Sequence, residues 1–329
     1  MKRVGYWLSE EKSKKLNFER CLELYRKAGV QLVKLDLETP LEGQGPFHMI
    51  LHKFIDILAL SQLGYEREHR YMRNIEEFIS RRPDCIIVNP LDRLQQFIDR
   101  KRLFRTVQEC CNENTDTGVF LPPFADLTSN DVDGNRARLM EANVRYPFVC
   151  KPVNAHGTED CHMMAIVFNE AGLCDVTAPC VAHQFINHDA TLYKVFKIGR
   201  KQYVIRRPSL RNLFVEDGQT TVFFNTRDVS KKHSAHLLTK PEPSSSESAP
   251  LAPEAYKLDV FCEALRQKLG VDMFGVDVIV DRDTHRCAVI DVNFFPGYNE
   301  VETFFADLLE YLSSLFARQK QDLPTAEMP

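Results

Sequence analysis

Two aspartates and an asparagine stand out near the C-terminal end of the chain, because they interrupt otherwise apolar segments. Residues 274–297, FGVDVIVDRDTHRCAVIDVNFFPG, consist of two apolar segments around the polar turn DRDTHR and end in Pro-Gly, which predicts a β-hairpin. A hairpin centred on Thr284 places Asp277 directly opposite Asp291, and Asn293 follows one step along the same face.

The facing aspartates predict a metal site. Like charges directly opposite each other on neighbouring strands are destabilising, so a cation is expected between them. Carboxylate and amide oxygens that leave room for phosphate and water suit Mg²⁺. Two solvated carboxylates on an exposed sheet face are the alternative, but Asn293 at the same-face spacing favours the metal. On this reasoning, Asp291→Asn relieves repulsion from Asp277 and leaves the metal-free protein at least as stable as before.

The alternation along the hairpin also predicts which side chains face the core. Ala288, Ile290 and Val292 alternate with Val289, Asp291 and Asn293, so each set is expected on its own face. A strand that carries a metal ligand on one face therefore buries its apolar residues on the other.

Composition limits the class of protein. A chain of 329 residues predicts two or three compact units, and 44% hydrophobic with 27% charged residues is ordinary for a globular protein. The net charge of −4 argues against bulk nucleic-acid binding, and no apolar run reaches the roughly 18 residues of a membrane span. The 10 cysteines form no CxxC pair, so we expect reduced thiols and a cytoplasmic location.

The first part of the chain alternates predicted strands and helices. Strands are expected near residues 3–8, 30–35, 49–52 and 85–88, with a charged helix at 66–82, which is typical of a small parallel-sheet domain. Lys12, Lys14 and Lys15 follow the first strand, where open α/β sheets bind ligands. Solvated charges at a helix start are an equally good interpretation of these lysines alone.

The middle of the chain predicts further strands around a glycine-containing loop. We expect one long helix over residues 91–113 and a loop over 115–128, followed later by a strand over 146–152 that ends near Lys151. The loop AHGT, residues 155–158, suits phosphate binding through backbone N–H groups, although a plain hairpin has the same composition. Segments 180–186, 192–198 and 202–205 are expected to pair in one antiparallel sheet.

The remaining segments are simpler to interpret. Apolar residues of 301–316 recur at i, i+3, i+4, i+7 and i+8, which predicts a helix with a core face. Residues 241–253 are rich in Pro, Ser and Glu and are expected to be mobile, and the tail 320–329 is expected to be disordered.

Several motifs together resemble one known family. RVGYWLSEEK, HK at 52–53, FVCKP with AHGT, FINHDATLYKVF, RRPSL and the hairpin FGVDVIV…AVIDVNFFPGY resemble the inositol 1,3,4-trisphosphate 5/6-kinase (inositol-tetrakisphosphate 1-kinase) family almost from end to end. The resemblance implies the ATP-grasp fold, an α/β and overall α+β architecture with a parallel-sheet N-terminal domain and two ATP-grasp domains with antiparallel sheets. The expected domains are 1–100, 101–195 and 196–319.

The resemblance also implies roles for individual residues. Asp277 would bind one Mg²⁺, Asp291 would bridge two ions, and Asn293 would bind metal while facing the substrate. The expected ATP-binding residues are Arg100, Lys151, His183, Gln184, Phe185, Ile186, Ser209, Thr226 and Ser230. The expected acceptor-binding residues are Lys12, Lys53, His162, Lys194, Asn293 and Gly297, with Lys194 and Asp291 expected to be catalytic.

Three positions depart from the family pattern. The loop before His162 is one residue longer, Thr226 replaces a serine, and the adenine-side residue is either His183 or Gln184. The threonine hydroxyl preserves the hydrogen-bonding group, so the nucleotide role is still expected there.

The expected activity is an ATP-dependent inositol polyphosphate kinase. The γ-phosphate would pass in line, with magnesium, to the 1-hydroxyl of inositol 3,4,5,6-tetrakisphosphate or the 5- or 6-hydroxyl of inositol 1,3,4-trisphosphate. Alternatives are an ATP-grasp carboxylate–amine ligase and a catalytically silent inositol-phosphate-binding scaffold. The acceptor-side cations favour the kinase over the ligase, and the paired aspartates argue against the scaffold. We expect a monomer whose partners are ATP and inositol polyphosphates, with no nucleic acid.

Overall fold

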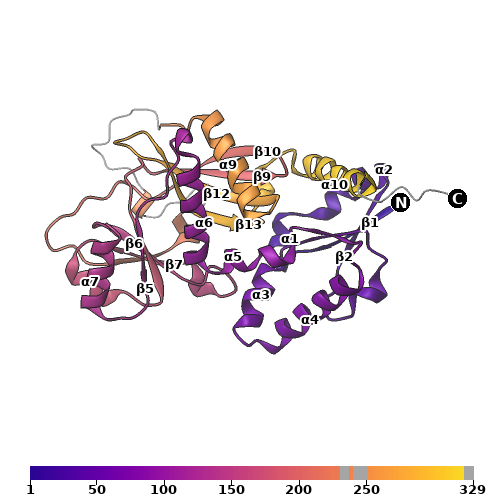
Figure 1. Cartoon of the computed structure of the whole chain (residues 1–329), viewed down its shortest axis with the longest axis horizontal. Helices are drawn as coiled ribbons and strands as arrows, with labels where there is room; N and C mark the ends of the chain where they lie inside the picture. Colours follow the sequence, from indigo (N-terminus) through magenta and orange to yellow (C-terminus); the bar gives the residue numbers. More distant parts are fainter. Residues whose placement is uncertain (230–236, 240–250, 322–329) are drawn as a thin grey trace.

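The computed structural model describes residues 1–229, 237–239 and 251–321, without the side chains of residues 320 and 321. The chain forms three sheets side by side, with the four-stranded sheet of β9, β10, β12 and β13 in the middle (Figure 1). Ser230 and most of the segment 241–253 lie outside the described residues, as does most of the tail 320–329. The mobility expected for these segments therefore stays a prediction.

The first sheet is parallel, as the alternation of strands and helices predicts. Its strand order is β2-β1-β3-β4, and every neighbouring pair is parallel. The strands are β1 (Lys2–Trp7), β2 (Val30–Lys34), β3 (Met49–His52) and β4 (Ile86–Val88). The helices are α1 (Glu10–Lys15), α2 (Leu22–Lys27), α3 (Ile55–Gln62) and α4 (Glu66–Arg81).

The second sheet has five antiparallel strands in the order β11-β7-β6-β8-β5. Its strands are β5 (Phe124–Leu127), β6 (Phe148–Pro152), β7 (Met163–Val167), β8 (Cys180–Gln184) and β11 (Val222–Asn225), and α7 (Val132–Glu141) follows β5. The prediction of a loop over 115–128 is wrong at β5. Strand β5 is only four residues long and its pairing partner, β8, lies more than fifty residues away in sequence, so local pattern does not indicate it.

The third sheet is antiparallel, with the order β10-β9-β12-β13. It contains β9 (Thr191–Ile198), β10 (Lys201–Pro208), β12 (Met273–Val280) and β13 (Cys287–Phe294). The prediction of one sheet from segments 180–205 is wrong, because β8 belongs to the second sheet and β9 to the third. The expected boundary at residue 195 falls inside β9, whereas the chain passes from the second sheet to the third between β8 and β9, returns to the second sheet at β11 and enters the third again at β12. The division into domains stays a proposal.

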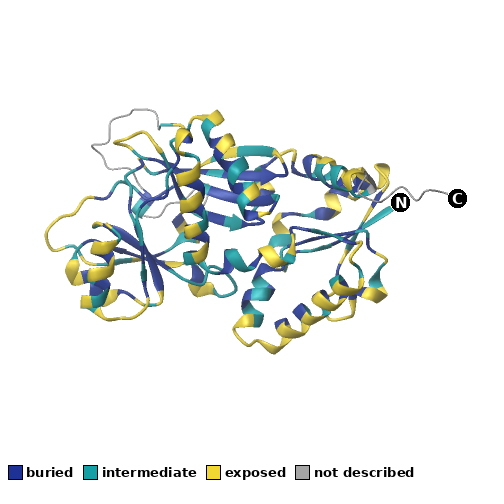
Figure 2. Ribbon diagram, viewed as in Figure 1, coloured by how far each residue is buried: buried dark blue, intermediate teal, exposed yellow. Residues whose placement is uncertain are grey.

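The first and third sheets share one apolar core, while the second sheet has separate clusters on its two faces. Helices α9 (Ala255–Leu269) and α10 (Phe304–Gln321) cover the third sheet and contribute Phe261, Leu308 and Leu312 to this core. In Figure 2 the strands are largely buried, and the outer faces of the helices are exposed. The predicted core face of the last helix is therefore confirmed.

The predicted helix over 91–113 is not continuous. It consists of a 3₁₀ turn at Leu91–Arg93, α5 (Gln95–Ile98) and α6 (Arg100–Glu113). Asp99 between them is extended, forms an isolated bridge with Asn154 just after β6 of the second sheet, and caps α6 by accepting from the Arg102 N–H at 3.2 Å. The Arg100 N–H donates to Val153 O at 2.9 Å. Because the helix restarts here, Arg100 stands at an N-terminus beside the second sheet.

Asn89 fixes the first sheet to the third. Its side-chain amide donates to Met273 O at 2.9 Å, and its side-chain oxygen accepts from the N–H groups of Asp272 and Met273 at 2.7 and 3.0 Å. The Asn89 carbonyl accepts from His52 Nε2 at 2.9 Å. Burial lowers the pKa of His52 to about 3, so the ring is neutral. These buried bonds hold the strand that precedes Lys53 against the hairpin strand β12.

Candidate active site

A cavity of about 680 Å³ lies where the three sheets meet, and it is lined by every predicted site residue that the structure describes. These residues are Lys12, Lys53, Arg100, Lys151, His162, His183, Gln184, Phe185, Ile186, Lys194, Ser209, Thr226, Asp277, Asp291, Asn293 and Gly297. The residues come from both ends of the chain, yet the fold places them around one space. Their individual roles stay predictions.

The hairpin register is confirmed at the pair of aspartates. Asp277 on β12 faces Asp291 on β13, and on its other side it faces Lys194 on β9. Lys194 Nζ donates to both carboxylate oxygens of Asp277, at 2.9 and 3.1 Å. Burial raises the pKa of Asp277, Asp291 adds to this effect, and Lys194 opposes it. A protein cation thus already offsets part of the repulsion between the two acids.

A β-bulge changes the predicted faces of β13. The register shifts after the Asp277–Asp291 pair, so that Val278 faces Val289 and Ile290 is the extra residue. The predicted face of Ala288, Ile290 and Val292 is therefore wrong: Val289 and Val292 lie in the shared core, while Ile290 and Asp291 both line the cavity. The bulge also turns the Ile290 carbonyl toward Lys151.

Two buried cations face Asp291. Lys151 is the penultimate residue of β6, and its Nζ donates to Ile290 O at 2.6 Å. Burial lowers the pKa of Lys151 to about 8, and Asp291 opposes this effect. Arg100 is 3% exposed and donates to Pro152 O. Burial lowers the pKa of Arg100, and the negative charge of Asp291 opposes this effect. The carboxylate of Asp291 therefore favours the charged form of both cations.

The predicted adenine side lies at the end of β8. The N–H groups of Gln184 and Phe185 donate to Pro123 O and Pro147 O at 2.8 and 3.2 Å, so they are committed to neighbouring chain segments. His183 is buried against Phe104, and its Nε2 has no hydrogen-bond partner in the described part of the chain. Burial lowers the pKa of His183 far below its ordinary value, so the imidazole is neutral.

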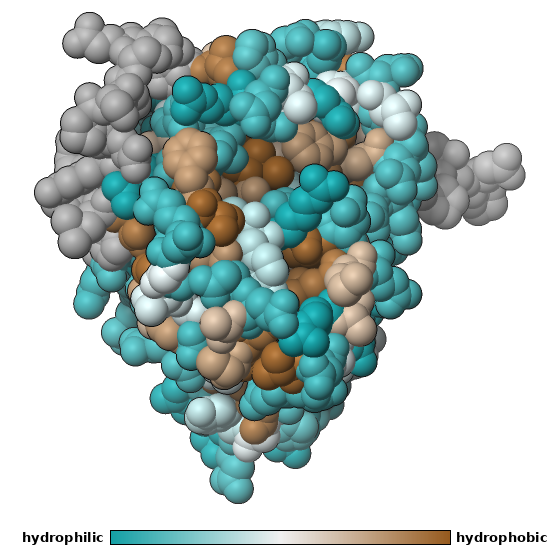
Figure 3. Space-filling view, turned by 90° about the vertical axis from the view of Figure 1, so that its left-hand side faces the viewer, coloured by the Kyte–Doolittle hydropathy of each residue, from teal (hydrophilic) through white to brown (hydrophobic). Residues whose placement is uncertain are grey.

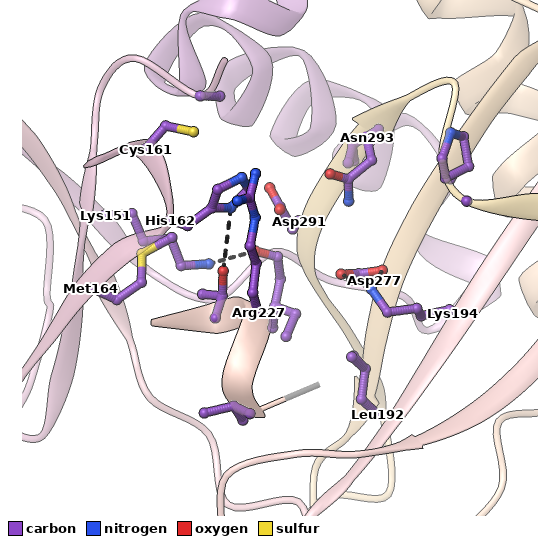
Figure 4. A pocket seen from close by; sticks show the side chains of 18 of the residues that line it. Lys151, Cys161, His162, Met164, Leu192, Lys194, Arg227, Asp277, Asp291 and Asn293 are labelled. Atoms are coloured by element: carbon purple, nitrogen blue, oxygen red, sulfur yellow. Dashed lines mark hydrogen bonds and ion pairs between the residues drawn. The ribbon is translucent and has the colours of Figure 1, made fainter. Parts of the chain in front are cut away.

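Hydroxyl groups on this side contact histidines. Ser209 Oγ lies 2.7 Å from His188 Nε2, and Thr226 Oγ1 lies 3.5 Å from His162 Nδ1. In the view of Figure 4, the side chains of His162 and Arg227 overlap and extend toward Asp291. Burial lowers the pKa of His162 to about 4, and the charge of Arg227 adds to this effect, so a neutral imidazole lies beside Thr226 in the cavity lining.

The predicted acceptor side holds half-buried lysines. Lys12 lies in α1, and burial together with Lys53 lowers its pKa to about 7. A Cβ on Gly297 would lie 3.0 Å from Asn299 Oδ1, which is a tight contact, and 3.6 Å from Lys12 Nζ, which is an ordinary one. Lys53 Nζ forms an ion pair with Asp56 at 3.2 Å. The cavity therefore carries cations both beside Asp291 and on the side opposite to β8.

Sequence reasoning missed several cavity residues. Asp56, His156, Arg227 and Glu300, the ion-pair partner of Arg207, all line the cavity. The basic pair Arg206-Arg207 is visible in the sequence, and Asp56 follows Lys53 at the i, i+3 spacing of a helix start. No local pattern indicates that His156 meets Asp56, because Asp56 lies in α3 and His156 lies in the loop after β6, about a hundred residues further along the chain.

The donor atoms fit a hard divalent cation bound together with phosphate. The described residues contain no cluster of three His, Cys, Asp or Glu side chains that could hold a metal ion. Asp277 and Asp291 are paired across the strands, and Asn293 supplies an amide oxygen from the same lining. Mg²⁺ is commonly held by one or two carboxylates plus substrate phosphates rather than by a complete protein cage. A cation at Asp277 would share or displace the contact with Lys194.

Solved structures define the fold. The chain is similar to the D-cycloserine synthetase DcsG (TM-score 0.60, 15% identity, 95% of this chain and 99% of that chain). It is also similar to a RimK domain ATP-grasp protein from Sphaerobacter thermophilus (TM-score 0.54, 13% identity, 94% and 98%). At these identities the likeness shows the fold alone, which is ATP-grasp, as the resemblance implied.

Sequence comparison then shows the family. Residues 113–314 match the inositol 1,3,4-trisphosphate 5/6-kinase ATP-grasp domain, and residues 3–94 match the pre-ATP-grasp domain of the same family. Inositol-tetrakisphosphate 1-kinases of Xenopus laevis and Danio rerio are each 38% identical to this chain, over 97% of it and 80% of their own length. The chain belongs to the inositol 1,3,4-trisphosphate 5/6-kinase family and is an inositol polyphosphate kinase.

One face of the molecule has the polar surface that is expected of a globular protein with 27% charged residues. Figure 3 shows a mainly hydrophilic face over the second sheet, with apolar side chains in small patches. Among the helices of the described residues, none has the length and apolar character needed to cross a membrane.

Proposed function

We propose that this kinase transfers the γ-phosphate of ATP to the 1-hydroxyl of inositol 3,4,5,6-tetrakisphosphate and to the 5- or 6-hydroxyl of inositol 1,3,4-trisphosphate. The relatives named inositol-tetrakisphosphate 1-kinase support the first acceptor, and the description of the matched family supports the second. The structural observation that carries the proposal is the position of Asp277, Asp291 and Asn293 between two groups of cations in one cavity.

The nucleotide occupies the side of the second sheet in this proposal. Lys151 and Arg100 meet the phosphates, and the end of β8 with Ser209, Thr226 and Ser230 meets the adenosine part. Both cations are buried and face Asp291, so they are preorganised beside the point where the terminal phosphate must lie. Preorganised cations stabilise the charge of a phosphoryl group in transfer without reorganising water.

The inositol phosphate occupies the opposite side. The acceptor-binding residues of this proposal are Lys12, Lys53, Lys194, Asn293 and Gly297 on that side and His162 beside Thr226, and all of them line the cavity. An acceptor with several phosphates needs several cations, and the lysines provide them by charge-assisted hydrogen bonds. Lys12 with a pKa of about 7 gains a proton when a phosphate approaches, because the anion compensates for the loss of water.

Two Mg²⁺ ions, held by Asp277, Asp291 and Asn293, would supply charge neutralisation between the phosphates and the attacking hydroxyl. Asp291 faces Asp277 across the hairpin and Asn293 follows on its own strand, so Asp291 is the residue suited to contact both ions. Lys194 is bound to Asp277 on the acceptor side, where it orients the carboxylate and offers its ammonium group to the acceptor phosphate. No side chain needs to form a covalent intermediate.

The test is incubation with MgATP and a panel of inositol phosphates that differ in the number and position of phosphates. Ion-exchange separation and two-dimensional NMR of the products identify the hydroxyl that gains phosphate. We expect transfer to the two named acceptors. ATP hydrolysis that depends on a carboxylate and an amine, without a phosphorylated inositol, would instead support a ligase. Binding of inositol phosphate without turnover would support a silent scaffold.

A further inference from the structure

Asp56 joins two cavity residues that come from different sheets. Its Oδ2 lies 3.2 Å from Lys53 Nζ, and its Oδ1 lies 3.4 Å from His156 Nδ1. Lys53 directly follows β3 of the first sheet, whereas His156 belongs to the loop after β6 of the second sheet. All three side chains line the cavity, and Lys53 and His156 are only 17% and 11% exposed.

The loop that carries His156 lies directly on helix α3, which carries Asp56. Gly157 has φ +95°, and a Cβ there would lie 3.1 Å from Ala59 Cβ and 3.4 Å from Leu60 Cγ. This close approach requires glycine, both for the backbone conformation and for the space. The position of the loop relative to α3 is therefore fixed by packing on one side and by the Asp56–His156 contact on the other.

The charge of Asp56 is maintained by its two partners. Burial favours the neutral acid, but the Lys53 ammonium and the His156 imidazole outweigh it and hold the pKa of Asp56 below its ordinary value. Burial lowers the pKa of His156, and the ionised Asp56 opposes this effect. An ionised carboxylate between two partners restricts both side chains, whereas a lysine without a counter-ion samples many rotamers.

We propose that Asp56 is a positioning residue of the acceptor site, which holds the Lys53 ammonium and the His156 imidazole in the arrangement that receives a phosphate group of the inositol substrate. This inference rests on the proposed function of the cavity as a phosphoryl-transfer site. Asp56 does not itself contact the acceptor phosphate, because two anions would repel each other. It acts through Lys53, and it fixes the AHGT loop to the first sheet.

Kinetics of Asp56→Asn test the proposal. The substitution preserves the shape but removes the charge that orders both partners. We expect the KM for the inositol polyphosphate to rise about tenfold, which corresponds to about 1.4 kcal/mol, while the KM for ATP changes less than about twofold. Asp56→Glu restores the charge and is expected to recover part of the acceptor affinity. Asp126→Asn is the matched control, because Asp126 also binds two cations, Lys101 and Arg105, outside the cavity.

Two results would overturn the proposal. An unchanged or lowered KM for the acceptor would show that Asp56 only opposes the acceptor charge. If Asp56→Asn raised the KM for both substrates equally and melted at a lower temperature than Asp126→Asn, the role of Asp56 would be structural.

An NMR measurement separates this inference from the proposed function. In ¹⁵N-labelled protein without substrates, Asp56→Asn should lower the pKa of His156 further, because the favourable carboxylate is lost. An unchanged His156 titration would refute the contact whatever the acceptor is. If the wild-type protein phosphorylates no inositol phosphate while the His156 pKa responds as expected, the proposed function fails and the Asp56 contact stands without a catalytic role.

Discussion

Asp291→Asn is the substitution that tests the centre of the site most directly. From the hairpin alone, removing one of two facing carboxylates should stabilise the metal-free protein by a few tenths of a kcal/mol. The cations around Asp291 lead us to predict the opposite sign. Asp277 already has Lys194 as its counter-ion, while Asp291 is the anion that faces the buried Arg100 and Lys151.

The magnitude follows from these neighbours. Loss of the Asp291 charge lowers the pKa of Lys151 further below about 8, and each pH unit of such a shift corresponds to about 1.4 kcal/mol. The loss of attraction to Arg100 adds to this cost, and relief of the repulsion from Asp277 subtracts a few tenths. We therefore expect metal-free Asp291→Asn to be about 1–3 kcal/mol less stable than wild type.

Urea unfolding in the presence of EDTA measures this difference. A double-mutant cycle that combines Asp291→Asn with Lys151→Met isolates the interaction between the two side chains. We expect a coupling free energy of about 1 kcal/mol. Kinase activity should fall by about a hundredfold or more. MgATP at about a hundred times its Kd should stabilise the wild type by about 2.7 kcal/mol and the variant by much less.

Either of two outcomes would refute this reasoning. A metal-free variant as stable as wild type, or more stable, would show that Asp291 is not the anion of Arg100 and Lys151. Retained phosphoryl transfer would show that Asp291 is not needed for metal binding or for transfer.

Three further predictions concern the cations of the cavity. Lys151→Ala should weaken ATP binding by about tenfold or more, because a buried charge-assisted contact to phosphate is lost; calorimetry that shows unchanged affinity would remove Lys151 from the nucleotide site. Lys194→Ala should raise the KM for the inositol phosphate, or lower kcat, with little change for ATP, and Lys201→Ala is the control because Lys201 pairs with Asp307 and Glu310 outside the cavity. Lys12 has a pKa of about 7, so it is charged below pH 7 and loses its proton above it; the acceptor KM should rise by up to about tenfold per pH unit above 7, toward the limit set by the pKa in the complex. Lys12→Arg should abolish this slope, since guanidinium stays charged, and a slope that persists would place the titration elsewhere.

The sequence by itself determined the local elements and the chemistry of the site. Alternation around the polar turn predicted the hairpin, and its length placed Asp277 opposite Asp291 as the structure has them. The apolar stripe predicted the core face of α10. The order of the motifs indicated the family, and the matching positions all line one cavity in the described part of the chain. These features depend on residues that are close in sequence or on resemblance to a family, and both can be read from the amino-acid sequence alone.

The tertiary structure alone decided which groups meet. Period-2 alternation reports the face of a strand but not its partner, so the assignment of β8 and β9 to different sheets was not predictable. The bulge at Ile290 moves one residue to the cavity face without any change in composition. Lys194 became the counter-ion of Asp277, and Asp56 met His156, through pairings and packing between segments far apart in sequence. Such contacts form only when burial of the shared cores brings the sheets together, and local preference carries no information about them.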